Sequence, residues 1–243
     1  MRINSFIQPG QFAGDEIILP PEESHHLARV LRVEAGQELT LFDGAGGRAA
    51  GAVLDVSKKA VTVKILSRET VPPPPVHITL IQALPKPDRF ETILQKATEL
   101  GVQKIIPVLT AHTIFKSTDP EKQSARWRSI ILNAAQQCGT AWLPVLRAPV
   151  KFAAVLPELK DFDAAFIASL YAGARPFREV FDAAGERKIK SAALLIGPEG
   201  DFSKEENNAA VNAGAAPVSF GTQILRTETA AIFGLSVLAY ELF

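Results

Sequence analysis

The sequence predicts an α/β protein, in which a parallel sheet carries helices on both faces and a smaller β-rich domain precedes it. Two patterns support this: short β-rich runs fill residues 1–71, whereas apolar runs alternate with helical patterns over residues 77–243. Between them stand four consecutive prolines, Pro72 to Pro75, which continue neither a helix nor a central strand. We therefore predict a Pro-rich linker over residues 72–76.

Composition limits the classes of function. The chain has 243 residues, 47% of them hydrophobic, and a formal net charge of +0, as expected of an ordinary globular protein. Its one cysteine, Cys138, cannot form an internal disulfide, and its four histidines are scattered, so we expect a cytoplasmic protein without a metal. The N-terminus lacks the apolar core of a signal peptide, and the C-terminal apolar run is too short to span a bilayer, so we expect no membrane role.

The N-terminal domain is expected to be a small β-barrel. Strand-like runs occupy residues 37–47 and 60–69, with Asp43-Gly44 as a turn signal between strands. One helix is predicted over residues 22–32, "EESHHLARVLR".

Five apolar runs beyond the prolines have the character of strands buried on both faces of a parallel sheet. They are residues 77–84, 104–109, 163–170, 191–197 and 217–221.

Helices are predicted between these strands. The first begins with Asp88 as its N-cap, with Glu91 three residues later, and ends at Gly101. The second has Asp119 before a first-turn proline and ends at Gly139. Two more follow "GPEGDF" and "GTQILRT". The second helix is predicted to bury Ile130, Ile131, Ala134 and Cys138.

In open parallel sheets, ligands bind beyond the carboxyl ends of the strands. The run 191–197 leads into Gly-Pro-Glu-Gly, and the next helix starts at Ser203 with Glu206 completing a capping box. The glycines allow a ligand to approach the backbone. Nearby acids disfavour a phosphate and suit a neutral or cationic small molecule, although a simple strand-to-helix turn is the alternative. The acids are Glu199, Asp201, Glu205 and Glu206.

A second glycine-bearing loop, "FGTQILRTETAAIFGL", follows the run 217–221. Thr227 is a candidate cap for the helix that begins here. Capping does not explain Arg226, because the positive end of the helix macrodipole disfavours a cation unless an anion faces it. A ligand carboxylate or an RNA phosphate would supply that anion.

Several motifs together resemble one family across nearly the whole chain: "SHHLARVLRVEAGQELTLFDGAGG", "KPDRFETILQKATELGV", "AAQQCG", "LLIGPEG" and "ILRTETA". They are similar to the bacterial small-subunit ribosomal RNA uridine-N3 methyltransferases, a branch of the SPOUT superfamily. The resemblance implies a PUA-like domain for RNA and a C-terminal trefoil knot that binds S-adenosylmethionine. It also implies a homodimer acting on N3 of one uridine, uridine 1498, of 16S ribosomal RNA, either naked or in the assembled 30S subunit.

Roles for individual residues follow from the resemblance for the cofactor contacts, and from charge and position in the chain for catalysis and RNA binding. Arg226 would position the base or stabilise its anion, with Glu228 or Glu199 as proton acceptor. RNA would be bound by Arg29 and Arg32, taken to share one helix face. The "LPKPDRF" loop and its surroundings would add Lys86, Arg89 and Lys116. Cofactor contacts would come from Leu170, Gly197, Pro198, Glu199, Gly200, Phe220, Gly221, Ile224, Leu225, Arg226 and Thr229.

This chain departs from the family pattern at several positions. Asp201 stands where a third glycine is usual, and Gln223 and Thr140 stand where arginine is common. Ala111-His112 replaces a Glu-Arg pair. These changes leave two alternatives open: a related enzyme for another RNA or for a ribose 2′-hydroxyl, or an assembly factor that binds RNA without catalysis.

Overall fold

The computed structural model describes residues 3–57, 60–115, 118–183 and 189–243. The chain divides into two compact units: unit 1 is Met1–Pro73 with Leu132–Leu143, and unit 2 is Pro74–Ile131 with Pro144–Phe243. Unit 1 thus includes the segment Leu132–Leu143, which is far in sequence from the predicted N-terminal domain of residues 1–71. The linker over residues 72–76 stays a prediction.

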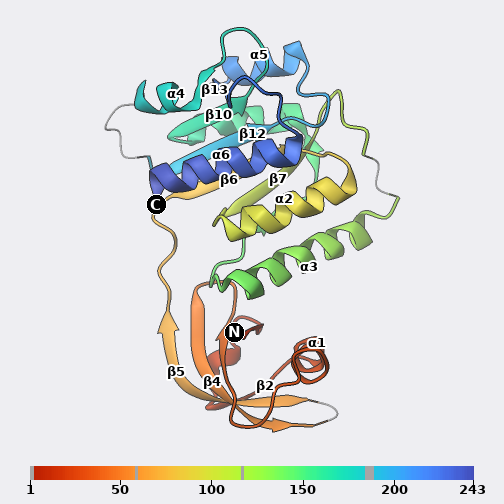
Figure 1. The fold of residues 1–243 in the computed structure, drawn as a ribbon, viewed down its shortest axis with the longest axis vertical. Helices are drawn as coiled ribbons and strands as arrows, with labels where there is room; N and C mark the ends of the chain where they lie inside the picture. Colours follow the sequence, from red (N-terminus) through yellow and green to blue (C-terminus); the bar gives the residue numbers. More distant parts are fainter. Residues whose placement is uncertain (1–2, 58–59, 116–117, 184–188) are drawn as a thin grey trace. The chain divides into compact units, whose positions relative to one another are not determined.

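Unit 1 is built on a mixed five-stranded sheet in the order β1-β3-β4-β5-β2 (Figure 1). β1 runs parallel to β3, and the other neighbours are antiparallel. β1 and β2 are the edges, so the pairing in the described residues is that of a small mixed sheet and not of a closed barrel. The strands are β1 (Asn4–Phe6), β2 (Glu16–Ile18), β3 (Glu38–Phe42), β4 (Gly47–Val56) and β5 (Val61–Thr70).

The helix predicted over residues 22–32 is present, but it changes from α-helical to π-helical hydrogen bonding partway along. An α-helix, α1 (Pro21–His25), runs into a π-helical stretch, η2 (His26–Leu31), and a short 3-10 turn, η1 (Gln11–Ala13), lies earlier in the chain. Arg32 follows in the left-handed region with φ 53°. The prediction that Arg29 and Arg32 share one helix face is therefore wrong.

A buried carboxylate connects the two segments of unit 1. Glu23 is 8% exposed and accepts a hydrogen bond of 2.6 Å from the Ser5 hydroxyl. The Gln136 amide donates to both oxygens of the same carboxylate at 2.9 Å. Because these bonds satisfy a buried charge, they anchor the end of helix α3 (Pro120–Cys138) to the mixed sheet.

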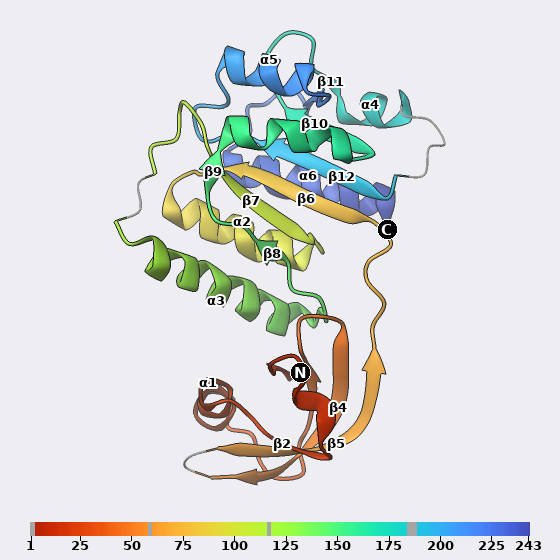
Figure 2. The same ribbon diagram turned by 180° about the vertical axis from the view of Figure 1, so that it is seen from behind.

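Unit 2 holds a parallel sheet in the order β11-β13-β10-β12-β6-β7-β8, with β9 also pairing with β7 (Figure 2). The five predicted runs are confirmed as β6, β7, β10, β12 and β13, and three two-residue strands escaped prediction. At its centre β12 pairs with β6, for example Leu195 with Ile81. The strands are β6 (His77–Ala83), β7 (Lys104–Leu109), β8 (Val145–Leu146), β9 (Val150–Lys151), β10 (Ala164–Ala168), β11 (Arg175–Pro176), β12 (Ser191–Ile196) and β13 (Ala216–Ser219).

Helices cover both faces of this sheet, as predicted (Figures 1 and 2). On one face, Ile81, Ile106 and Leu195 form a core with the 3-10 helices and α5. On the other lie α2 and α6, where a Cβ on Gly234 of α6 would stand only 2.8 Å from the Leu194 side chain. The covering elements are α2 (Pro87–Glu99), η3 (Phe152–Ala154), η4 (Leu156–Asp161), α4 (Phe177–Ala183), α5 (Lys204–Asn212) and α6 (Thr227–Leu242).

Two details of the predicted helices are corrected. The N-cap of α2 is Lys86 and not Asp88. Pro87 takes the first helical position, so the helix begins earlier in the sequence than predicted. Cys138, predicted to face inward, is exposed. α3 otherwise begins as expected, since Asp119 accepts a hydrogen bond of 3.0 Å from the Lys122 amide.

Among the described helices, none is both long and apolar enough to cross a membrane. The trefoil knot stays a prediction.

Candidate functional site

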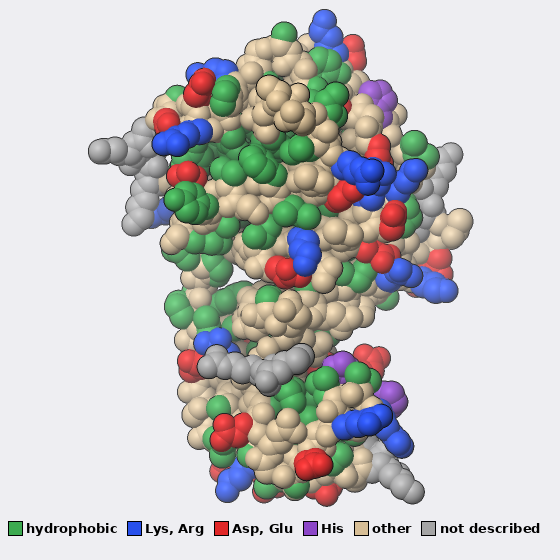
Figure 3. Space-filling view, in the orientation of Figure 1, with side chains coloured by type: hydrophobic (Ala, Val, Ile, Leu, Met, Phe, Trp, Pro, Cys, Tyr) green, Lys and Arg blue, Asp and Glu red, His purple; other side chains and the backbone are tan. Residues whose placement is uncertain are grey.

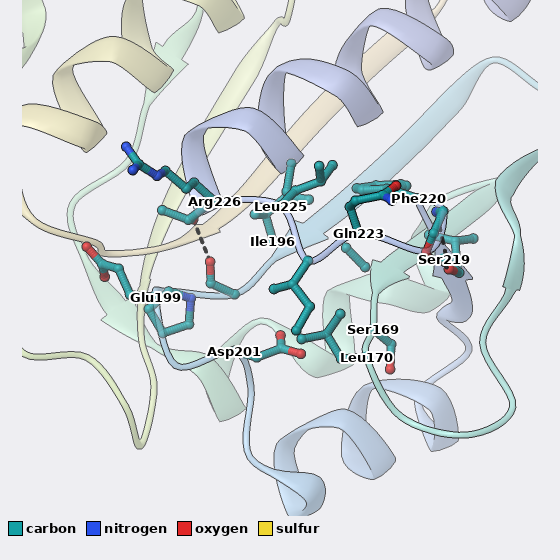
Figure 4. Close-up of a pocket in the computed structure, with 18 of the residues that line it drawn as sticks. Ser169, Leu170, Ile196, Glu199, Asp201, Ser219, Phe220, Gln223, Leu225 and Arg226 are labelled. Atoms are coloured by element: carbon teal, nitrogen blue, oxygen red, sulfur yellow. Dashed lines mark hydrogen bonds between the residues drawn. The ribbon is translucent and has the colours of Figure 1, made fainter.

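A cavity of about 270 Å³ lies in unit 2 where β10, β12 and β13 end (Figure 4). The three loops that leave these strands form its walls, together with the start of α6, as the parallel-sheet rule predicts. Figure 4 shows Glu199 and Arg226 at one end and Ser219 and Phe220 at the other. The lining residues are Arg89, Ala168, Ser169, Leu170, Ile196, Gly197, Pro198, Glu199, Asp201, Val218, Ser219, Phe220, Gly221, Gln223, Ile224, Leu225, Arg226, Thr227 and Ala230.

The loop after β12 is held by a buried hydrogen-bond cluster. The Thr227 hydroxyl donates to the Gly197 carbonyl at 2.7 Å, and the Gln82 amide donates to that hydroxyl at 3.1 Å. Gln82 is 0% exposed and also donates to the Ala83 carbonyl at 2.9 Å. The alternative that Thr227 caps α6 is therefore wrong: Arg226 is the N-cap residue, and the Thr227 hydroxyl joins α6 to the glycine loop.

Two acids and one arginine form an ion-pair network at one end of the cavity. Arg89 Nη1 lies 3.5 Å from Glu199 Oε1 and 3.9 Å from Glu228 Oε2. The backbone amide of Lys86 donates to Glu199 Oε1 at 3.1 Å. Arg89 and Lys86, predicted from sequence to bind RNA, thus lie beside the predicted catalytic acids.

Asp201 occupies a strained turn on the same loop. Its φ is 57°, in the left-handed region, which Asp tolerates better than most residues. The Phe202 amide donates to its Oδ1 at 2.8 Å, and burial raises the pKa of its carboxyl. His112 Nδ1 lies 2.9 Å from the Asp201 carbonyl oxygen, so two departures from the family pattern are in contact.

The loop after β13 has few internal bonds. Ile224 is 80% exposed, although it lines the cavity. In the described part of the chain the backbone amides of Ile224 and Leu225 have no acceptor, so both remain available to a ligand.

Most predicted cofactor residues line the cavity, but two do not. A Cβ on Gly200 would stand 3.2 Å from His112 Cβ, so this glycine allows the close approach of a histidine. Thr229 is exposed on α6. Glu228 is also absent from the lining, although it pairs with Arg89. Those that line the cavity are Leu170, Gly197, Pro198, Glu199, Phe220, Gly221, Ile224, Leu225 and Arg226.

Sequence reasoning missed several residues of the site. Ser169 and Ser219 stand at strand ends, so the same rule that found the glycine loops would have found them. Gln82 gave no such signal, because its role depends on contacts between distant segments.

The remaining predicted residues lie elsewhere. Arg29 and Arg32 are exposed in unit 1, and Lys116 lies outside the described residues. His, Cys, Asp and Glu side chains form no group of three suited to a metal ion within the described ranges.

Comparison with known proteins agrees with this architecture. Residues 72–239 match the family described as RNA methyltransferase domain, and residues 19–66 match the RNA methyltransferase PUA domain. Ribosomal RNA small subunit methyltransferase E of Bacillus subtilis is 30% identical over 229 residues, covering 90% of this chain and 88% of its own. The Mycobacterium bovis protein of the same name is 30% identical over 224 residues, covering 91% and 85%.

Two solved structures are similar to this chain over nearly their whole length. Ribosomal RNA small subunit methyltransferase E from Neisseria gonorrhoeae, bound to S-adenosylmethionine, has a TM-score of 0.88 at 28% identity and covers 99% of this chain and 98% of its own. A Legionella pneumophila protein in complex with the same cofactor has a TM-score of 0.88 at 36% identity, with the same coverage. On these matches, and on the cavity formed by its strand-end loops, this chain belongs to the RNA methyltransferase family, with the catalytic domain over residues 72–239 and the PUA domain over residues 19–66.

Proposed function

We propose that this protein transfers a methyl group from S-adenosylmethionine to N3 of one uridine, uridine 1498, in the 16S RNA of the small ribosomal subunit. The observation that carries the proposal is the cavity at the ends of β10, β12 and β13, formed by the "GPEG" and "ILRTETA" loops. The relatives named for small-subunit ribosomal RNA and the neighbours that hold the cofactor support it.

The residues of the cavity fit this cofactor. Apolar side chains of Leu170, Ile196 and Leu225 would cover an adenine ring. The unpaired backbone amides of Ile224 and Leu225 would donate hydrogen bonds to its ring nitrogens. When bound, the cofactor supplies a methyl group already activated on a positively charged sulfonium.

The chain's own residues would orient the base and accept its proton. N3 of uridine carries a weakly acidic imide proton, which must leave before the nitrogen attacks the methyl carbon. Arg226 would stabilise the resulting anion, and Glu199 would accept the proton directly or through water. Arg89 fixes the Glu199 carboxylate through their 3.5 Å ion pair, and Glu228 extends the same network. Orientation of this kind contributes on the order of 7–11 kcal/mol in favourable cases.

A homodimer is part of the same proposal. α6 is apolar on several sides, and its exposed residues include Phe233 at 43% and Tyr240 at 86%. Figure 3 shows hydrophobic side chains gathered on the face of unit 2 that carries α6. Exposed apolar patches of this kind are typical of subunit interfaces. Light scattering would give twice the mass of one chain, and a Tyr240→Glu variant would be monomeric.

The proposed function is tested by methylation of defined RNA substrates with purified protein, and we propose that the reaction takes place in the cytoplasm. Purified protein and S-adenosylmethionine are incubated with naked 16S RNA and with 30S subunits from a strain that lacks the modification. Nucleoside mass spectrometry should then detect 3-methyluridine at a single site. A 2′-O-methyl nucleoside, or no methylation of either substrate, would contradict the proposal.

A further inference from the structure

Asp201 occupies a backbone conformation that costs free energy. Its φ of 57° makes it one of two non-glycine residues with positive φ in the described chain, the other being Arg32. A glycine there would remove the strain, and strain of this kind is concentrated at ligand-binding sites. Position 201 thus carries an aspartate although its backbone conformation alone would favour glycine.

The side chain is directed to the cavity wall by two backbone amides. The Phe202 amide donates to Oδ1 at 2.8 Å, and the backbone amide of Leu170, in the loop after β10, interacts favourably with the carboxylate, which lowers its pKa against the larger rise caused by burial. The carboxylate lies against Gly197, since a Cβ on that glycine would stand 2.6 Å from Oδ1. Figure 4 shows Asp201 beside Leu170, with its carboxylate toward the cavity. It therefore joins two of the three cofactor loops.

The charge of Asp201 has no ionic partner in the described residues. Glu199, the other acid in the lining, is paired with Arg89 at 3.5 Å, whereas no Lys, Arg or His side chain of the described chain lies within 4.0 Å of the Asp201 carboxylate. His112 Nδ1 contacts the Asp201 backbone oxygen, and the ring also acts on the carboxylate over a longer distance, in the direction that lowers its pKa against the larger rise caused by burial. A carboxylate has room for about four hydrogen bonds, so two amides leave acceptor capacity free. The cavity thus has one anion that a bound cation would neutralise.

We propose that Asp201 recognises the positive charge of the methyl donor, so that the site binds S-adenosylmethionine more tightly than its product S-adenosylhomocysteine. The two ligands differ in the methyl group and in the charge of the sulfur, which is a sulfonium in the donor and a neutral thioether in the product. An anion in the wall therefore favours the donor and eases release of the product. This inference rests on the proposed function. Burial raises the pKa of Asp201, and a cation nearby would lower it.

The experiment compares the affinities of both ligands by calorimetry for three proteins. Asp201→Asn keeps the shape and tolerates positive φ but removes the charge. Glu205→Gln is the matched control, because Glu205 is exposed on the same acidic corner and does not line the cavity. Asp201→Gly is a second variant that relieves the strain, should the asparagine variant fold poorly.

We expect Asp201→Asn to weaken binding of S-adenosylmethionine about tenfold, in the range of one charge-assisted contact. Binding of S-adenosylhomocysteine should weaken less than about threefold, and Glu205→Gln should change neither affinity by more than about twofold. Equal losses for both ligands, or no loss for either, would overturn the inference, because a purely structural role does not distinguish them. Failure of the unmodified protein to bind either ligand would instead overturn the proposed function.

Discussion

Two loops border the same cavity but are held in opposite ways. The loop after β12, residues 197–203, is fixed by bonds to its neighbours: Thr227 donates to the Gly197 carbonyl, Lys86 to Glu199, and His112 contacts the carbonyl oxygen of Asp201. Within the described ranges, the loop after β13, residues 221–226, makes only local bonds, such as the 3.0 Å contact between the Thr222 and Gln223 side chains. One wall of the cavity is thus formed in advance, and the other is free to adjust.

The difference indicates a division of roles. A fixed wall positions a ligand at little entropic cost on binding, because its order is already present in the folded chain. A wall with unpaired amides and an exposed apolar residue gains contacts only when a ligand arrives. Substitutions that break the bonds holding the fixed loop should therefore lower stability, whereas substitutions in the free loop should change binding and turnover with little effect on stability.

The largest expected effect is on turnover, at the end of the free loop. Arg226→Ala should reduce methyl transfer by at least about 100-fold, because a charge that stabilises the developing anion is lost. The free energy of unfolding should change by less than about 0.5 kcal/mol, since Arg226 is exposed. Arg178→Ala, an exposed arginine on α4, is the control. Methylation assays and urea unfolding check both; near-normal turnover of Arg226→Ala would remove it from the mechanism.

The next effect contrasts two threonines: Thr227 of α6, whose hydroxyl holds the fixed loop, and Thr222 in the free loop. Thr227→Val should lower the free energy of unfolding by about 2 kcal/mol, because it removes the buried hydroxyl that donates to the Gly197 carbonyl and accepts from the Gln82 amide. Thr222→Val should cost less than about 0.5 kcal/mol, since its hydroxyl is exposed. Chemical denaturation measures both. Equal costs would remove the distinction between the loops.

Two glycines give a smaller contrast. Gly197→Ala should cost about 1–3 kcal/mol, because its Cβ would stand 2.6 Å from Asp201 Oδ1 and 3.0 Å from Asp201 Cα. Gly221→Ala should cost about 1 kcal/mol, from its φ of 117° alone, since its Cβ would enter open space. Adding Asp201→Gly to Gly197→Ala should recover part of the loss. If the double variant recovers nothing, the contact with Asp201 is not the cause.

The smallest effect is a pH dependence of stability. Burial raises the pKa of Asp201 in the folded protein above its value in the unfolded chain, so the folded state binds the proton more tightly. The resulting stabilisation is fully present below the unfolded pKa and is lost as the pH rises through the folded one. Relative to Asp201→Asn, the unmodified protein should therefore gain stability as the pH is lowered from neutral into that range. Parallel stability curves for the two proteins would contradict the assignment.

The sequence predicted the sheet well because buried parallel strands are short, continuous apolar runs. β7 matches its predicted run, residues 104–109, at both ends. The rules for helix starts and helix periodicity failed at two places. Lys86, and not Asp88, caps α2 because Pro87 is its first residue, and the helix predicted over residues 22–32 is partly π-helical.

The site was predictable only in part. Glycines and strand ends identified the loops, since both signals are local. Thr227 and Gln82 could not be assigned, because the bond between them joins residues 145 positions apart. The ion pair of Arg89 with Glu199 could not be predicted either, because the two residues are far apart in sequence, and the RNA contact of Arg89 stays a prediction.

The pairing of β6 with β12 also has a consequence for how the protein folds. Ile81 meets Leu195 at the centre of the sheet, so the chain must close a loop of more than 100 residues before this pair forms. Topologies of this kind fold slowly, and we expect refolding over seconds, not microseconds. Because Gln82 and Gly197 stand at the ends of these two strands, the methyl-donor cavity should unfold together with the whole sheet, and hydrogen exchange of the amides within β6 and β12 should report global unfolding.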